Sequence, residues 1–145
     1  MADHTDVPEV IQAQRFELVD AAGTVRAVLA LGPGGNPILG LGDEKDKTRA
    51  GLMVLPDGNP NLALRDEKGE VRAALRLLSD GGPGLVLWDD KGQGRATLSL
   101  APDGSPSVEL WDAKGKGRAM LRLLPDGSPV LALHDEGGEV IWSAP

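Results

Sequence analysis

The feature of this sequence that most constrains its fold is a unit of 23 residues that recurs without insertion or deletion. Three markers keep this spacing: the arginine of an Arg-Ala pair, a proline and an aspartate. They fall at Arg26, Arg49, Arg72, Arg95 and Arg118, at Pro37, Pro60, Pro83, Pro106 and Pro129, and at Asp20, Asp43, Asp66, Asp89, Asp112 and Asp135. A unit this short can bury its apolar side chains only against a neighbouring unit or a partner chain.

Each unit contains two strand patterns. One reads Leu-x-Leu-x-Asp, as at Leu62 to Asp66, and the other reads Arg-Ala-x-Leu-x-Leu, as at Arg72 to Leu77. Alternation with a period of two places the apolar side chains on one face of a half-buried antiparallel strand. The sequence has 20 glycines and 11 prolines, and their regular spacing is typical of turns between strands. The sequence therefore predicts an all-β fold of six 23-residue hairpins joined as an antiparallel meander.

The turn that contains proline suits a short loop. Pro102-Asp103-Gly104 fits a three-residue loop with proline first and glycine at positive φ. That loop places Leu98 opposite Val108, so that both side chains lie on the apolar face.

The Asp-x-x-Gly turn needs a different solution. A three-residue loop at Asp66-Glu67-Lys68-Gly69 would turn the apolar pattern of one strand to the wrong face. We therefore expect a four-residue loop with Leu64 opposite Ala73. We also expect the Asp66 carboxylate to accept hydrogen bonds from turn amides and Gly69 to adopt positive φ.

The apolar face of such a sheet needs a covering surface, because burying one leucine contributes about 1.5–3 kcal/mol. We expect the assembly core to contain one leucine slot in successive units and the C-terminal tryptophan: Leu29, Leu52, Leu75, Leu98, Leu121 and Trp142. The equal length of the units favours a homotrimeric β-prism with these side chains inside. Two alternatives stay open, a compact trefoil-like body and a parallel β-solenoid, although a solenoid would stack like charges about 4.8 Å apart.

Composition limits the partners and the cellular location. The net charge of −7 argues against nucleic-acid binding, since phosphate contacts need clustered lysine and arginine. We expect residues 1–11 to form an N-terminal arm and residues 12–145 to form one β-repeat domain. The arm lacks a signal-peptide pattern and no apolar run is long enough for membrane insertion, so the chain is expected to be made in the cytoplasm. A place on a virion or an extracellular appendage would need another route.

The sequence offers no set of residues for catalysis or for a metal. His4 and His134 are the only histidines, there is no cysteine, and no serine belongs to a nucleophile motif. We therefore expect a protein that is not an enzyme and that has no cofactor.

Three side chains are candidates for contact with a ligand or a partner. Trp88, Trp111 and His134 occupy the same slot in successive units, on the face away from the leucines. Tryptophan in such a place can stack on sugar rings or form the centre of a protein contact. The simpler interpretation is that this second face is partly covered by other side chains.

The segment Leu62–Leu75, Leu-x-Leu-x-Asp-x-x-Gly-x-x-Arg-Ala-x-Leu, resembles the strand–turn–strand repeats of trimeric viral and phage fibre or spike shafts. The resemblance extends from Arg15 to Ser143. It implies a homotrimeric structural protein of fibre, spike or appendage type that assembles through its leucines. The alternative is a carbohydrate-binding module that uses Trp88 and Trp111 as stacking platforms.

Overall fold

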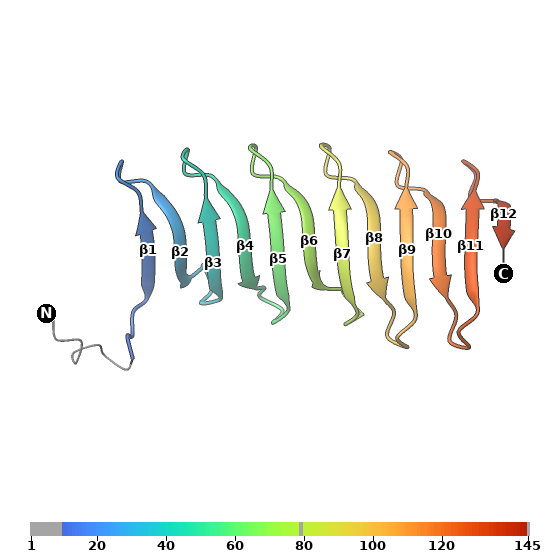
Figure 1. Ribbon diagram of the computed structural model, residues 1–145, viewed down its shortest axis with the longest axis horizontal. Coiled ribbons are helices and arrows are strands. Elements are labelled where there is room, and N and C mark those ends of the chain that lie inside the picture. Colours follow the sequence, from blue (N-terminus) through green and yellow to red (C-terminus); the bar gives the residue numbers. More distant parts are fainter. Residues whose placement is uncertain (1–9, 79, 145) are drawn as a thin grey trace, which may run out of the picture.

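The computed structural model describes residues 10–78 and 80–144, which form one antiparallel sheet of twelve strands (Figure 1). The strands are β1 (Arg15–Val19), β2 (Val25–Leu31), β3 (Pro37–Gly42), β4 (Thr48–Val54), β5 (Pro60–Arg65), β6 (Val71–Leu77), β7 (Pro83–Trp88), β8 (Gly94–Leu100), β9 (Pro106–Trp111), β10 (Gly117–Leu123), β11 (Pro129–His134) and β12 (Val140–Ala144). Each strand pairs with its neighbours in sequence. The predicted all-β meander of six hairpins is confirmed.

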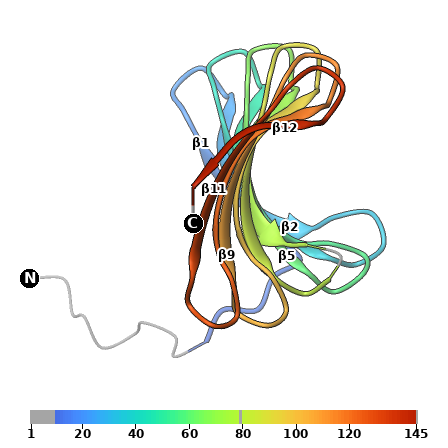
Figure 2. The same cartoon turned by 90° about the vertical axis from the view of Figure 1, so that its right-hand side faces the viewer.

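The sheet stays open. It runs from β1 at one edge to β12 at the other, and these two strands do not pair (Figure 1). Seen from its end, the sheet is an arc rather than a closed ring (Figure 2). The trefoil-like and β-solenoid alternatives are therefore wrong. Short turns join each strand to an antiparallel neighbour, which excludes the parallel stacking of a solenoid.

The proline turns have the predicted geometry. The Ala101 N–H donates to the Ser105 carbonyl over 2.9 Å, and the Gly104 N–H donates to the Ala101 carbonyl over 2.8 Å. Gly104 has φ 84°, as a three-residue loop that ends in a left-handed glycine requires. Leu98 lies opposite Val108, so both the loop and the register are confirmed.

The aspartate turns are shorter than predicted. The Asp66 N–H donates to the Glu70 carbonyl over 3.0 Å, and the Gly69 N–H donates to the Asp66 carbonyl over 3.1 Å, which again closes a three-residue loop. The four-residue prediction is wrong. The other expectations hold, because the Asp66 carboxylate accepts from the N–H groups of Lys68 and Glu70, and Gly69 has φ 87°.

A β-bulge makes the shorter loop compatible with the apolar pattern. Arg65 pairs with Val71 and Leu64 pairs with Ala73, which leaves Arg72 as an extra residue in β6. One extra residue shifts the register by one and returns the apolar side chains to a single face. The same bulge places an extra arginine in the other units, at Arg26, Arg49, Arg95 and Arg118.

The bulge arginine joins one hairpin to the next. Arg72 Nη1 lies 3.4 Å from Asp66 Oδ2 in its own turn, and Arg72 Nε donates to the Trp88 carbonyl over 3.0 Å. Arg95 and Arg118 repeat both contacts. Arg26 makes the same two contacts, whereas Arg49 makes only the ion pair with Asp43 of its own turn. Four of the five bulge arginines thus connect their own turn to the end of the first strand of the following hairpin.

The described residues begin inside the predicted N-terminal arm. Residues 1–9, which make up most of the predicted arm and include His4, lie outside the described residues, as do Ser79 and Pro145. Val10 to Gln14 contain no strand or helix. The strands from Arg15 to Ala144 form one sheet.

Candidate functional surfaces

The leucine face is made of three rows of side chains that cross the sheet. The central row pairs in register as Phe16, Leu29, Leu39, Leu52, Leu62, Leu75, Leu85, Leu98, Val108, Leu121, Leu131 and Ala144. A second row alternates leucine and alanine from Leu18 and Ala27 to Leu133 and Trp142. The third contains leucine–proline or valine–proline pairs such as Leu77 with Pro83. No polar side chain belongs to these rows.

The predicted assembly residues lie together on this face, and a single chain leaves them open to solvent. Their exposed fractions are 50% for Leu29, 49% for Leu52, 53% for Leu75, 53% for Leu98, 48% for Leu121 and 48% for Trp142. The sheet is one layer thick, so no described element packs over the leucines (Figures 1 and 2). The leucine face is thus an uncovered apolar surface.

Shallow apolar grooves cross the leucine face at equivalent places in three of the units. One lies between the Leu52, Leu62 and Leu75 side chains and the prolines Pro60 and Pro83. Similar grooves lie around Leu39 and Pro37, and around Val108 and Pro106. The surface therefore has apolar projections and hollows with the period of the repeat.

The most buried residues of the chain lie on the opposite face. Ala63, Ala74 and Ala132 are at most 4% exposed, and Val86 is 8% exposed. Longer side chains lie over glycines of the same face, as Leu78 does over Gly84 and Val28 does over Gly40. In residues 10–78 and 80–144 the closest packing is therefore on the face away from the leucines, which agrees with the interpretation that this second face is partly covered by other side chains.

The two tryptophans on the opposite face each pair with a glycine. Trp88 lies opposite Gly94 and Trp111 lies opposite Gly117. A glycine leaves room for an indole ring beside it. A Cβ atom at Gly117 would lie 3.7 Å from Trp111 Cδ1 and Nε1, so the edge of this ring lies over the glycine. The arrangement gives Trp111 a structural contact in addition to any binding role.

Trp88 has a different neighbour. The Arg76 guanidinium carbon lies 5.6 Å from the centroid of the Trp88 ring, within the range of a cation–π contact. Arg76 comes from the adjacent strand β6. One side of Trp88 is therefore occupied by protein, whereas no such cation contact is found for Trp111 among the described residues.

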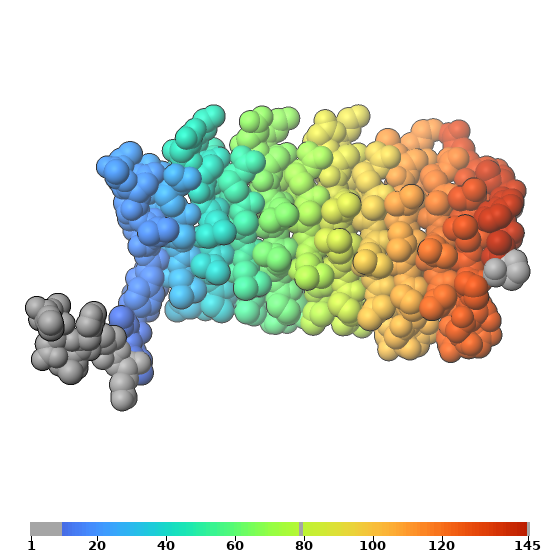
Figure 3. All heavy atoms as spheres, viewed as in Figure 1, coloured from blue at the N-terminus to red at the C-terminus, as the bar shows by residue number. Residues whose placement is uncertain are grey.

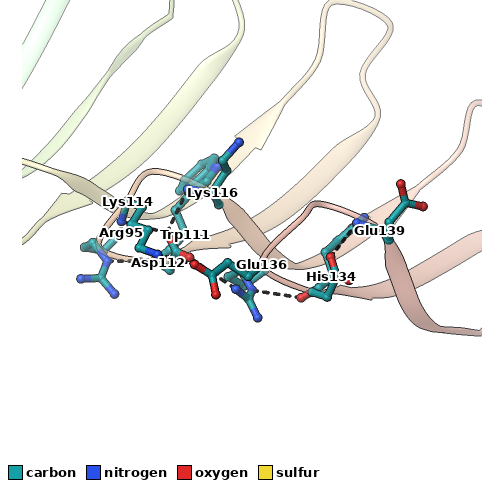
Figure 4. Close-up of polar contacts among 10 residues, drawn as sticks. Arg95, Trp111, Asp112, Lys114, Lys116, His134, Glu136 and Glu139 are labelled. Atoms are coloured by element: carbon teal, nitrogen blue, oxygen red, sulfur yellow. Dashed lines mark hydrogen bonds and ion pairs between the residues drawn. The ribbon is translucent and has the colours of Figure 1, made fainter.

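The sheet keeps the three candidate contact residues apart. Trp88, Trp111 and His134 end alternate strands, β7, β9 and β11, so successive members are about 9.6 Å apart across the sheet. Trp111 and His134 take part in the connections between hairpins through their carbonyls, which accept from Arg95 and Arg118 (Figure 4). Lys114 also contacts Glu136 of the next turn (Figure 4). His134 does not belong to a metal-binding set, since the described residues contain no group of three metal-ligating side chains.

A polar strip on the opposite face was missed by the sequence analysis. Thr97 pairs with Glu109, and Ser99 pairs with Ser107, whose hydroxyls lie 3.2 Å apart. These four residues of β8 and β9 lie on the same face as Trp111. A comparison of the copies would have found Glu109, because its slot holds small or apolar residues in four other units, Gly40, Ala63, Val86 and Ala132, and a glutamate only at Glu17 of the first unit.

The aspartates of the turns are held in their charged form by backbone hydrogen bonds. The Gln93 N–H has the largest effect on Asp89 and lowers the pKa of its carboxyl below the usual 3.8. Desolvation opposes this shift, and the Lys91 N–H and Arg95 add to it. The pKa is lowered in the same direction at Asp20, Asp43, Asp57, Asp66, Asp103, Asp112 and Asp126.

These aspartates make the fold sensitive to acid. A carboxyl whose pKa is lower in the folded chain stabilises the fold fully above 3.8, and this contribution is lost as the pH falls through the lowered pKa. Thermal unfolding followed by circular dichroism should therefore show a falling melting temperature from about pH 4 downward, with little change between about pH 5 and pH 7. A variant with Asp89→Asn and Asp112→Asn should lose less stability over the acid range. An equal loss in both proteins would contradict this assignment.

Comparisons with known proteins do not place the chain in a family. No family model and no curated protein matches it. Among solved structures it is similar to the wild-type TCP10 domain of CPAP from Danio rerio, with 18% identity, a TM-score of 0.22, and coverage of 88% of this chain and 93% of that chain. It is also similar to a mutant of that domain, with 15% identity, a TM-score of 0.19, and coverage of 88% and 92%. Similarities this low assign no function. In residues 10–78 and 80–144 no helix has the length and apolar character to cross a membrane.

Proposed function

We propose that this chain is a non-enzymatic structural protein of fibre, spike or appendage type, which assembles with copies of itself through the leucine face. The observation that supports this proposal is the unbroken apolar surface across all twelve strands of a single chain. Among the described residues, His134 shares no side-chain hydrogen bond with a serine, and the paired hydroxyls of Ser99 and Ser107 have no histidine beside them in the hydrogen-bond pattern, so no acid–base–nucleophile set is found there.

The size of the leucine face is that of an interface. Twelve strands about 4.8 Å apart, each about six residues long, cover about 1,100 Å². The largest apolar patch on an ordinary monomer covers about 300–600 Å², whereas a stable interface buries about 800 Å² on each partner. An uncovered apolar surface of this size favours association of the chain over a monomeric state in solution.

The period and chemistry of the leucine face favour another copy as its occupant. The grooves lie at equivalent places in three units, and the leucines that could enter them recur every 23 residues. The face presents no charge with which an unlike partner could be selected. In a homotrimeric prism the three leucine faces meet inside and the opposite faces remain in water. The net charge of −7 argues against a nucleic acid as the partner.

The solution mass tests this proposal. Light scattering after size exclusion should give about 45 kDa, three times the chain mass of 15.1 kDa. A mass of about 30 kDa would support assembly and reject the trimer. A stable mass of 15.1 kDa at micromolar concentration would reject assembly through the leucines altogether.

A further inference from the structure

We propose that the opposite face of β7 to β10 is a saccharide-binding site, with Trp111 as its stacking platform and Glu109 as its main hydrogen-bonding group. This activity is separate from assembly, because the site and the leucine face lie on different sides of the sheet. Assembly through the leucines would leave the site open to solvent.

The polar strip is a local departure from the repeat. Thr97, Ser99, Ser107 and Glu109 place three hydroxyls and a carboxylate on adjacent strands, where the second and third units carry residues such as Gly40, Gly51 and Ala63. The first unit has Glu17 in the slot of Glu109, but that carboxylate pairs with Arg15. All four are partly exposed. No hydrogen bond or ion pair engages the Glu109 carboxylate within the described part of the chain. A half-buried, unpaired carboxylate in the middle of a sheet face has spare capacity to accept hydrogen bonds from a ligand.

The distances suit one sugar ring beside the carboxylate. Trp111 and Glu109 are two residues apart in β9, so their side chains leave the same face about 6.6 Å apart. Thr97 lies directly opposite Glu109, with Cβ atoms about 5 Å apart. A pyranose whose C–H face lies on the indole can therefore direct its hydroxyls toward Glu109 and Thr97.

The position of Trp88 favours an oligosaccharide over a single sugar. Trp88 and Trp111 are two strands apart, about 9.6 Å, which is comparable to the length of a disaccharide. Arg76 lies over the Trp88 ring, so we assign Trp88 a flanking contact and leave the main stacking to Trp111. A chain lying across the strands would extend from one indole to the other.

The chemistry of the site favours neutral, β-linked sugars of the gluco configuration. Their equatorial hydroxyls leave both ring faces as C–H surfaces for stacking on an indole and point outward to in-plane partners such as Glu109. Glu109 would repel acidic sugars. The suitable probes are therefore cellotetraose and chitotetraose.

The test measures binding of these two probes to the intact protein by saturation-transfer NMR and calorimetry. We expect wild-type protein to bind at least one probe with a dissociation constant of about 1 mM or lower. Trp111→Ala and Glu109→Ala should each weaken binding by about tenfold or more, which corresponds to about 1.4 kcal/mol. Glu109→Ala introduces the residue type found at Ala63 and Ala132, so the fold should tolerate it.

The matched control is Glu17→Ala, which makes the same substitution in the same slot of the first unit, in β1 and far from the polar strip. It should bind the probes as wild-type protein does, and all variants should keep the circular dichroism and solution mass of the wild type. The proposal is wrong if neither probe binds, if binding survives both Trp111→Ala and Glu109→Ala, or if Glu17→Ala weakens it equally. If Trp111→Ala fails to fold, the comparison of Glu109→Ala with Glu17→Ala decides.

Discussion

The Leu75→Asp variant should remain folded and lose the ability to assemble. Leu75 lies in β6 near the middle of the sheet, opposite Leu62 and Leu85, and 53% of it is exposed in a single chain. An aspartate there can reach water in the free chain. In an assembly through the leucine face it would be buried among leucines at a cost of about 4 kcal/mol or more, which raises the dissociation constant about a thousandfold. Light scattering should give the chain mass of 15.1 kDa, with the circular dichroism of a β-sheet protein.

The control for Leu75→Asp is an aspartate on the other side of the sheet. Arg122→Asp places it at an exposed position of β10, on the opposite face. That variant should keep the mass of the wild-type assembly. If Leu75→Asp also kept this mass while folded, the leucine face would not be the interface. If both variants became single chains, a general charge effect would explain the result better.

The Ala74→Pro variant should lose the cooperative unfolding of the sheet. Ala74 is 4% exposed in β6, an interior strand, where it lies between Ala63 and Val86. Proline removes a backbone N–H that an interior strand needs for its ladder, and its ring also crowds the adjacent strand, so the cost should be about 3 kcal/mol or more. Because each strand pairs only with its sequence neighbours, the damage should separate β1–β5 from β7–β12.

Thermal unfolding and limited proteolysis can check this expectation. The variant should melt at a lower temperature, with broad or split transitions, and a protease should cut it near β6. The matched control is Ala21→Pro, which places proline first in a three-residue loop, as Pro102 is in the other type of turn. This control should melt like the wild type. A single sharp transition of Ala74→Pro at the wild-type melting temperature would contradict the view that the sheet is stabilised through the pairing of each strand with its sequence neighbours.

The sequence predicts the strands and their register because alternation and turn residues carry that information. Gly69 at positive φ and Leu64 opposite Ala73 are both found as expected. The bulge at Arg72 was not foreseen, because an extra loop residue and an extra strand residue produce the same register. The openness of the sheet could not be derived either, since alternation identifies the apolar face without specifying what covers it.

For the candidate surfaces too, the sequence determines which face a residue lies on but not how the side chains pack there. The slots of Leu75 and Trp111 are determined by period and alternation, so the sequence places them on opposite faces correctly. Alternation also indicates that long side chains such as Leu78 point to the second face, but it does not predict that Ala63 and Ala74 become the most buried side chains. That Thr97 and Glu109 lie side by side is known only from the register in which β8 pairs with β9.

The contacts of the bulge arginine also bear on how the length of this protein can change. Arg72 binds a carboxylate of its own unit and a backbone carbonyl of the next, and any residue can supply a carbonyl. If one 23-residue unit were deleted or duplicated, a bulge arginine such as Arg72 would still meet a strand-end carbonyl of the unit that follows it (Figure 3 shows the units side by side). Unequal recombination between the repeats of the gene would yield shorter or longer sheets that fold without further mutations. Related genes should therefore differ in length by whole 23-residue units.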